Sequence, residues 1–164
     1  MIDSYIRTYG RRLYGLCLSL CGNTHDAEDL YQETWLRVLD QLHRYDPSRP
    51  FEPWLTQICV NLYRNELRRL SRTPFVQFTS NESRDALFAT LAAPDRQDHL
   101  DLYRAIDDLP EKLRLTVILF YFRQMDLAET AAMLKVPAGT VKSRLNKARK
   151  LLKEVLTDGT DLQF

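Results

Sequence analysis

Hydrophobic residues recur at helical spacing in the first part of the chain, and few runs alternate as a half-buried strand would. The spacing predicts three helices, at residues 4–21, 25–43 and 52–71. Gly22 ends the first of these helices, and either Asn23 or Thr24 can cap the second. Tyr45–Pro50 is predicted to be a loop because its two prolines prevent a continuous helix. Residues 1–72 are therefore expected to form one compact helical domain.

A second helical domain is predicted over residues 98–156, where the apolar spacing indicates four short helices. Pro110 breaks the first helix from the second, and the Asp126-x-x-Glu129 pattern is a capping signal for the third. Residues 73–97 lack sustained periodicity and read as a linker, and residues 157–164 form a short acidic tail. The expected fold class is all-α, with two small helical domains joined by a flexible linker.

The C-terminal helices carry a strong local charge. A helix at 127–134, a turn at 135–139 and a helix from Thr140 onward form a helix-turn-helix pattern. Seven Lys or Arg and no acid lie between Lys135 and Lys153, although the net charge of the whole chain is only +1. The remaining residues therefore sum to −6 (the total of +1 less these seven). The pattern is typical of a helix that enters the DNA major groove, and the alternative is a merely solvated basic helix.

The composition favours an ordinary soluble protein, with 164 residues, 45% hydrophobic and 27% charged. Three cysteines, an odd number, without a signal peptide predict free thiols in a reducing compartment. No apolar run reaches the roughly 18 residues that a membrane span requires. We therefore expect a cytoplasmic location without membrane insertion.

A second basic region ends the helix at 52–71, and aromatic residues precede it. Four arginines (Arg64, Arg68, Arg69 and Arg72) face one acid, Glu66, and the aromatic residues are Tyr45, Phe51, Trp54 and Tyr63. Basic groups that follow phosphates, together with rings on which bases stack, are what unpaired DNA requires. The alternative is that Phe51 and Trp54 belong to an ordinary core.

The helix at 25–43 has an acidic face. It contains Asp26, Glu28, Asp29, Gln32 and Glu33. Such a face repels a phosphate backbone and suits a basic protein surface, although a charged helical face is commonly just solvated.

Cys17, Cys21 and His25 are spaced so that they could bind zinc or respond to oxidants. The apolar setting of the cysteines favours a core role instead, and a structural zinc site requires four ligands. No catalytic pair is visible, since Asp107, Asp108 and Glu111 are helix-end residues. We therefore expect no enzyme activity, no metal and no cofactor.

Taken together, these motifs resemble an extracytoplasmic-function (ECF, group IV) RNA polymerase sigma factor of the sigma-70 family. Asp26–Trp35 is similar to the region 2.2 helix, Phe51–Asn61 to the start of the helix that handles the −10 element, and Pro137–Leu145 to the −35 recognition helix. Leu109-Pro110 resembles the early break in domain four, and the family lacks the region between the two domains. In this chain, Lys135 stands in a turn where glycine is frequent.

The resemblance implies a division of labour in the transcription of a stress- or signal-responsive set of genes. Core RNA polymerase, through its β′ clamp helices and β flap, and promoter DNA would be the partners, and an anti-sigma factor is expected as a regulator. The residues implied in core binding are Asp26, Glu28, Asp29, Gln32, Glu33, Trp35 and Leu36. Those implied in −10 binding are Tyr45, Asp46, Phe51, Trp54, Asn61, Arg64, Asn65, Arg68 and Arg69. Those implied in −35 binding are Thr140, Lys142, Ser143, Arg144, Lys147, Arg149 and Lys150.

Two other interpretations compete with this one. A stand-alone helix-turn-helix regulator would explain the basic helix but not the acidic helix or the arginine-aromatic helix. A sigma mimic that sequesters an anti-sigma factor would use the acidic face but has no need of an uninterrupted basic helix. Binding to core polymerase separates the first alternative from the sigma factor, and binding to DNA separates the second.

Overall fold

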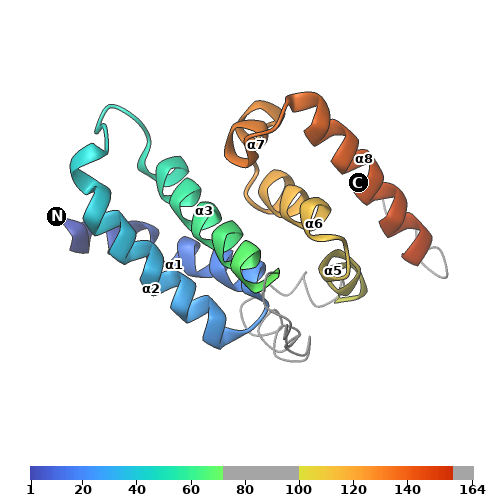
Figure 1. Cartoon of the computed structure of the whole chain (residues 1–164), viewed down its shortest axis with the longest axis horizontal. Helices are drawn as coiled ribbons and strands as arrows, with labels where there is room; N and C mark the ends of the chain where they lie inside the picture. Colours follow the sequence, from blue (N-terminus) through green and yellow to red (C-terminus); the bar gives the residue numbers. More distant parts are fainter. Residues whose placement is uncertain (72–99, 157–164) are drawn as a thin grey trace. The chain divides into compact units, whose positions relative to one another are not determined.

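The computed structural model describes residues 1–71 and 100–156, which form two compact helical units. The first unit holds α1 (Ile2–Cys21), α2 (Thr24–Gln41), the 3-10 turn η1 (Leu42–Arg44) and α3 (Phe51–Ser71). The second holds α5 (Leu100–Asp107), α6 (Glu111–Val117), the π-helical turn η3 (Ile118–Phe122), α7 (Leu127–Leu134) and α8 (Ala138–Leu156). Every regular element of these described residues is helical, which confirms the all-α prediction (Figure 1).

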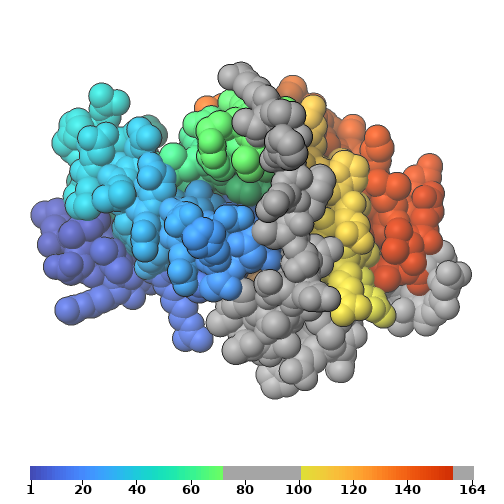
Figure 2. All heavy atoms as spheres, turned by 60° about the horizontal axis from the view of Figure 1, so that its bottom comes forward, coloured from blue at the N-terminus to red at the C-terminus, as the bar shows by residue number. Residues whose placement is uncertain are grey.

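In the first unit, α1 ends and α2 begins at the residues that the sequence predicts. Gly22 ends α1 with a φ of 80°, a left-handed conformation that glycine adopts without steric cost. Asn23 then caps α2, and its side-chain oxygen accepts a 2.8 Å hydrogen bond from the backbone N–H of Asp26. Helices α1 and α2 lie side by side, as the spheres of Figure 2 show, and both pack against α3. The core between the three helices is built from residues that include Leu13, Leu16, Val38, Leu55 and Val60.

The second unit is built around α8. Its core contains Ile106 from α5, Leu113 and Val117 from α6, and Val141 and Leu145 from α8. The predicted capping signal is present, because the Asp126 carboxylate accepts a 2.7 Å hydrogen bond from the Glu129 backbone at the start of α7.

Lys135 forms the turn between α7 and α8 with φ 58° and ψ 45°. This is the left-handed conformation that glycine favours and that a side chain with a Cβ atom adopts at a cost. The turn therefore explains why a glycine would suit this position.

The predicted linker (residues 73–97) and the predicted tail (residues 157–164) lie outside the described residues, and the domain boundaries remain predictions. None of the helices within residues 1–71 and 100–156 has the length and the apolar character that crossing a membrane requires.

Candidate nucleic-acid and protein interfaces

Helix α2 presents an exposed acidic face. Asn23 fixes its first turn, and the spacing of Ala27, Leu30, Thr34 and Val38 turns one side of the helix into the core. The predicted residues on the other side are all exposed: Asp26, Glu28, Asp29, Gln32 and Glu33. Two large apolar side chains follow them, Leu36 at 60% exposure and Leu39 at 52%. An acidic surface that continues into exposed leucines suits a protein partner with basic and apolar side chains.

Trp35 differs from the other predicted residues of this helix. Its side chain is only 6% exposed and packs edge-on to Tyr31, with the ring centroids 6.2 Å apart. The Trp35 side chain therefore belongs to the core of the first unit. The exposed surface of α2 consists of the acids, Gln32 and the two leucines.

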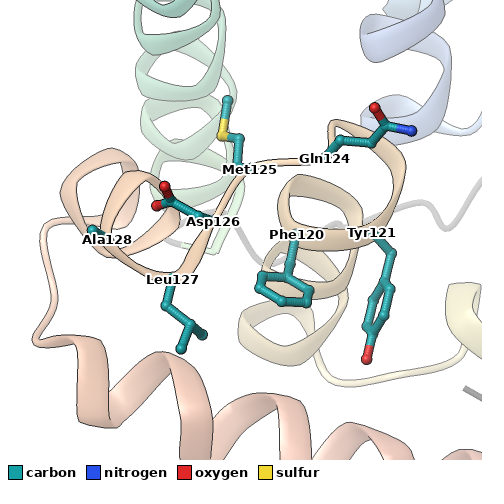
Figure 3. Close-up of a pocket in the computed structure, with 7 residues that line it drawn as sticks. All are labelled: Phe120, Tyr121, Gln124, Met125, Asp126, Leu127 and Ala128. Carbon is teal, nitrogen blue, oxygen red and sulfur yellow. The ribbon is translucent and has the colours of Figure 1, made fainter.

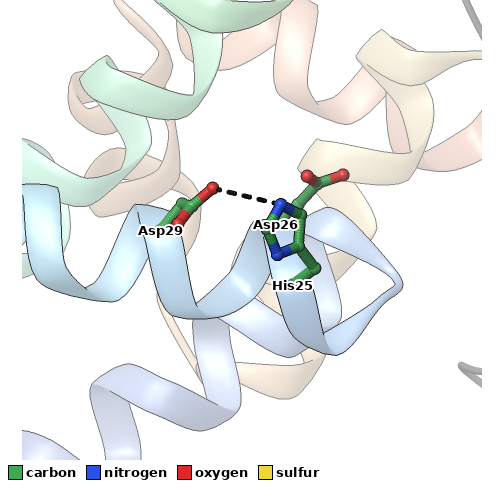
Figure 4. A group of neighbouring side chains, drawn as sticks. All are labelled: His25, Asp26 and Asp29. Atoms are coloured by element: carbon green, nitrogen blue, oxygen red, sulfur yellow. Dashed lines mark ion pairs between the residues drawn. The ribbon is translucent and has the colours of Figure 1, made fainter.

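His25, Asp26 and Asp29 form a small cluster at the start of α2 (Figure 4). Their ligand atoms lie within 4.8 Å of one another, and His25 Nε2 is 3.7 Å from an Asp29 carboxylate oxygen. All three side chains are exposed, and the cluster is part of the acidic face. Three solvated groups of this kind are ordinary surface residues in the absence of a further ligand.

Among the described residues, the candidate ligands Cys17, Cys21 and His25, whose spacing left a zinc site open beside the favoured core role, do not come together as one group. Cys17 is fully buried against Cys59, with the two sulfur atoms 3.8 Å apart, whereas His25 is exposed on α2. Cys17 and Cys59 thus behave as small hydrophobic residues of the core.

An aromatic cluster surrounds the loop before α3. Phe51, 4% exposed, is its centre, and the half-buried rings of Tyr45 and Trp54 lie 5.3 and 5.6 Å from it. Two tyrosines of α1 complete the cluster: Tyr5 stacks on Phe51 at 4.1 Å, and Tyr9 lies 5.1 Å away. The sequence predicts Tyr45, Phe51 and Trp54 at this site but not the two tyrosines of α1, because helical spacing is the only signal that these two carry.

The loop itself is held by its own hydrogen bonds. The Asp46 carboxylate accepts from the Ser48 backbone (3.0 Å) and hydroxyl (2.7 Å), and these bonds lower the pKa of Asp46. The Tyr45 hydroxyl donates to the Arg49 carbonyl, which closes the loop from the other side. The half-buried rings therefore stand on a preformed loop, which is the arrangement that a stacked base requires.

The C-terminal half of α3 carries the predicted basic residues. Asn65, Arg68 and Arg69 are exposed, while Asn61 and Arg64 are half-buried. Arg69 donates two hydrogen bonds to Glu66, at 3.0 and 2.6 Å, and the Arg69 side chain lowers the pKa of this carboxyl. This pairing balances the charge of Arg69, which makes Arg68 the better candidate for a phosphate contact.

Helices α7 and α8 form the predicted helix-turn-helix. Val141, Leu145, Ala148 and Leu152 are buried, which fixes the side of α8 that faces solvent. Lys142, Ser143, Lys147 and Lys150 are exposed on that side, and Thr140 and Arg144 are half-buried beside them. The Ser143 hydroxyl donates to the Gly139 carbonyl at 3.0 Å. The predicted residues therefore share one accessible surface, with the exception of Arg149.

Arg149 turns toward the body of the second unit. Its Nε donates a 2.8 Å hydrogen bond to the hydroxyl of Tyr121, and its guanidinium carbon lies 5.7 Å from the centre of that ring. Tyr121 also lines a surface pocket with Phe120, Gln124, Met125, Asp126, Leu127 and Ala128. In Figure 3, the side chains of Phe120, Tyr121 and Leu127 point toward α8.

In comparisons with known proteins, each of the two units matches a family model. The family model described as "Sigma-70 region 2" matches residues 5–73, and the model described as "Sigma-70, region 4" matches residues 99–152. The chain is 36% identical over 159 residues to the protein named "ECF RNA polymerase sigma factor SigE" of Mycolicibacterium smegmatis, covering 94% of this chain and 61% of the longer relative. It is 34% identical to "ECF RNA polymerase sigma factor EcfG" of Rhodopseudomonas palustris, covering 91% of this chain and 82% of that protein.

The fold is also that of solved sigma factors. The sigma factor RpoE of Bartonella quintana, solved in complex with the anti-sigma factor NepR, superposes with a TM-score of 0.74 at 21% identity. That match covers 96% of this chain and 98% of the solved one. At this identity the likeness concerns the fold alone.

Proposed function

This chain belongs to the extracytoplasmic-function group of sigma-70 RNA polymerase sigma factors, and we propose that it binds core RNA polymerase and directs it to −10 and −35 promoter elements. The observation that carries the proposal is the segregation of charge on exposed helices. The face of α2 is acidic, whereas α8 has six Lys or Arg and a single acid, Glu154. One surface therefore suits a basic protein and the other suits DNA.

Core polymerase binds the exposed face of α2 in this proposal. The acids Asp26, Glu28, Asp29 and Glu33 approach basic side chains of the partner, and Gln32 can donate and accept hydrogen bonds among them. Leu36 lies one turn after Gln32 and Glu33, so the partner gains apolar contact area beside the charged pairs.

The −10 element binds at the loop before α3. An unpaired base stacks on the half-buried rings of Tyr45 and Trp54, and such stacking contributes about 1–3 kcal/mol per base. Arg64 and Arg68 follow on α3 and approach the backbone of the same strand. Because Phe51 is buried beneath these rings, it supports the stacking surface without touching the base.

The −35 element binds α8. Lys142, Ser143 and Arg144 lie in the first two turns, which reach base edges when such a helix enters the major groove. Lys147 and Lys150 approach phosphates one and two turns further along. These residues provide both sequence readout and sequence-independent affinity.

An anti-sigma factor is the expected regulator of this chain. The solved relative from Bartonella quintana is bound to such a protein, and the faces of α2 and α8 are accessible to a covering partner here. Covering either face would prevent the formation of an active complex with polymerase and promoter.

The test of this proposal is a charge reversal on α2. Changing Asp29→Lys and Glu33→Lys together should abolish co-elution with purified bacterial core polymerase during gel filtration. The circular dichroism spectrum should not change, since both side chains are exposed. A double variant with Asp101→Lys and Asp108→Lys, two exposed acids of the second unit, supplies the matched control and should still co-elute. Undiminished core affinity of the α2 variant would show that this face does not bind polymerase.

A further inference from the structure

Arg149 is set apart from the other basic residues of α8 by its contacts. Its Nε donates to Tyr121 (2.8 Å), and a terminal nitrogen donates to the side-chain oxygen of Asn146 (3.2 Å). Lys147 and Lys150 on either side of it are exposed and make no hydrogen bond or ion pair with any residue that the structure describes. Arg149 is half-buried.

The position of Arg149 on the helix explains this difference. It directly follows the buried Ala148 and is six residues beyond Ser143, so it lies about 120° around the helix from that exposed serine at 3.6 residues per turn. Arg149 therefore occupies the border between the buried stripe and the solvent-facing side. A side chain at this border reaches the body of the unit more readily than a DNA phosphate.

Tyr121, which accepts the hydrogen bond from Arg149, is itself fixed in position by its neighbours. It belongs to the π-helical turn η3, which the 3.1 Å hydrogen bond from the Arg123 N–H to the Ile118 carbonyl defines. Phe120 packs edge-on against it, with the ring centroids 5.0 Å apart and the planes at 84°. The contact joins residues 28 positions apart, so it fixes α8 to a different part of the unit.

We infer that Arg149 is a positioning residue that holds α8 at its working orientation through Tyr121, and that it does not neutralise a DNA phosphate. The inference rests on the proposed role of α8 as the helix that binds the −35 element. The planar guanidinium directs two of its donors to Tyr121 and Asn146, and its carbon lies within cation–π distance of the tyrosine ring. The pocket residue Tyr121 thereby becomes part of the DNA-binding apparatus although it does not touch DNA.

The salt dependence of DNA binding separates a positioning role from a phosphate contact. Each phosphate contact contributes about 0.9 to the slope of log affinity against log salt concentration. Arg149→Ala should weaken binding of the full chain to a promoter duplex about two- to tenfold, the range for one hydrogen bond, and leave this slope unchanged. Tyr121→Phe, which keeps the ring and the charge, should weaken binding in the same way, and the double variant should be no weaker than Arg149→Ala alone. Lys150→Ala is the matched control and should reduce the slope by about 0.9.

A measurement without DNA completes the test. Hydrogen exchange of the α8 backbone should accelerate in Arg149→Ala and in Tyr121→Phe but not in Lys150→Ala. A slope reduced in Arg149→Ala as in Lys150→Ala, with wild-type binding by Tyr121→Phe, would overturn the inference. Unchanged exchange in both variants would also overturn it. If no variant, Lys150→Ala included, alters duplex binding while exchange still accelerates, the −35 role of α8 fails and the positioning of α8 by Arg149 stands.

Discussion

Tyr5 provides the sharpest test of how the loop before α3, the proposed −10 site, is supported, because it lies on α1, about 40 residues from that loop. Its ring stacks on Phe51 at 4.1 Å and 16°, and it meets Tyr45 edge-on at 6.5 Å. Tyr5→Ala removes both contacts. Aromatic pairs contribute about 0.5–1.5 kcal/mol each beyond their buried area, so the loop should lose about 1–3 kcal/mol of support. A loss of this size corresponds to a weakening of roughly 5- to 150-fold if the loop must be ordered to bind.

The assay is the affinity of the full chain, in complex with core polymerase, for a single-stranded oligonucleotide that carries the −10 element. Tyr14→Ala is the matched control, since Tyr14 is a half-buried tyrosine on the same helix that packs on Tyr31 (5.6 Å) instead of the loop. Tyr5→Ala should weaken binding to the strand while Tyr14→Ala leaves it unchanged. Equal weakening by both variants would mean that general destabilisation is responsible, and unchanged binding by Tyr5→Ala would show that this tyrosine does not support the loop.

Three further predictions concern the other parts of the chain. Arg144→Ala should weaken −35 binding by about 1–3 kcal/mol and relax the base preference in a competition between promoter sequences, and retained preference would show that another residue reads the bases. Lys135→Gly should stabilise the second unit by up to about 1 kcal/mol in urea unfolding, because it relieves a left-handed residue; a lower midpoint would contradict this. The bonds from Ser48 lower the pKa of Asp46, so their stabilisation is present above the ordinary carboxyl value of about 4 and is lost as the pH falls through the lowered value. Fluorescence of the nearby Trp54 should therefore stay constant at neutral pH and change only in acid, and a transition near neutrality would argue against this role of Asp46.

Most of the helices could be predicted from the sequence because their cores are built from regularly spaced apolar residues. The stripe of Val141, Leu145 and Leu152 both defines α8 and orients its basic side. Local signals such as the Asn23 and Asp126 caps could also be read, since a cap depends on residues only three positions apart.

The π-helical turn could not be predicted in this way. Ile118–Phe122 is a run of five apolar residues with no polar position to reveal the phase of the helix, so the apolar spacing does not show where the α-helical geometry of α6 ends. The wider turn instead ends at Phe122, is followed by Gln124 at a φ of 54°, and directs Tyr121 toward α8.

Contacts between residues far apart in the sequence also could not be predicted. The spacing of Tyr5 and Tyr9 shows that they share a helical face, but it does not reveal that Phe51 covers that face. The partner of Arg149 lies 28 residues away, and charge alone groups this arginine with the exposed lysines of α8. In both cases, residue type indicated an interaction and only the packing showed its partner.

We propose that this chain directs core RNA polymerase to a defined set of promoters. The most direct measurement is transcription in vitro on fragmented genomic DNA of the source organism, with core polymerase alone and with the protein added, followed by sequencing of the transcript 5′ ends. We expect new start sites that share −10 and −35 elements at a fixed spacing and that disappear with the Asp29→Lys, Glu33→Lys variant. Start sites that are identical with and without the protein would show that it does not direct the polymerase to promoters.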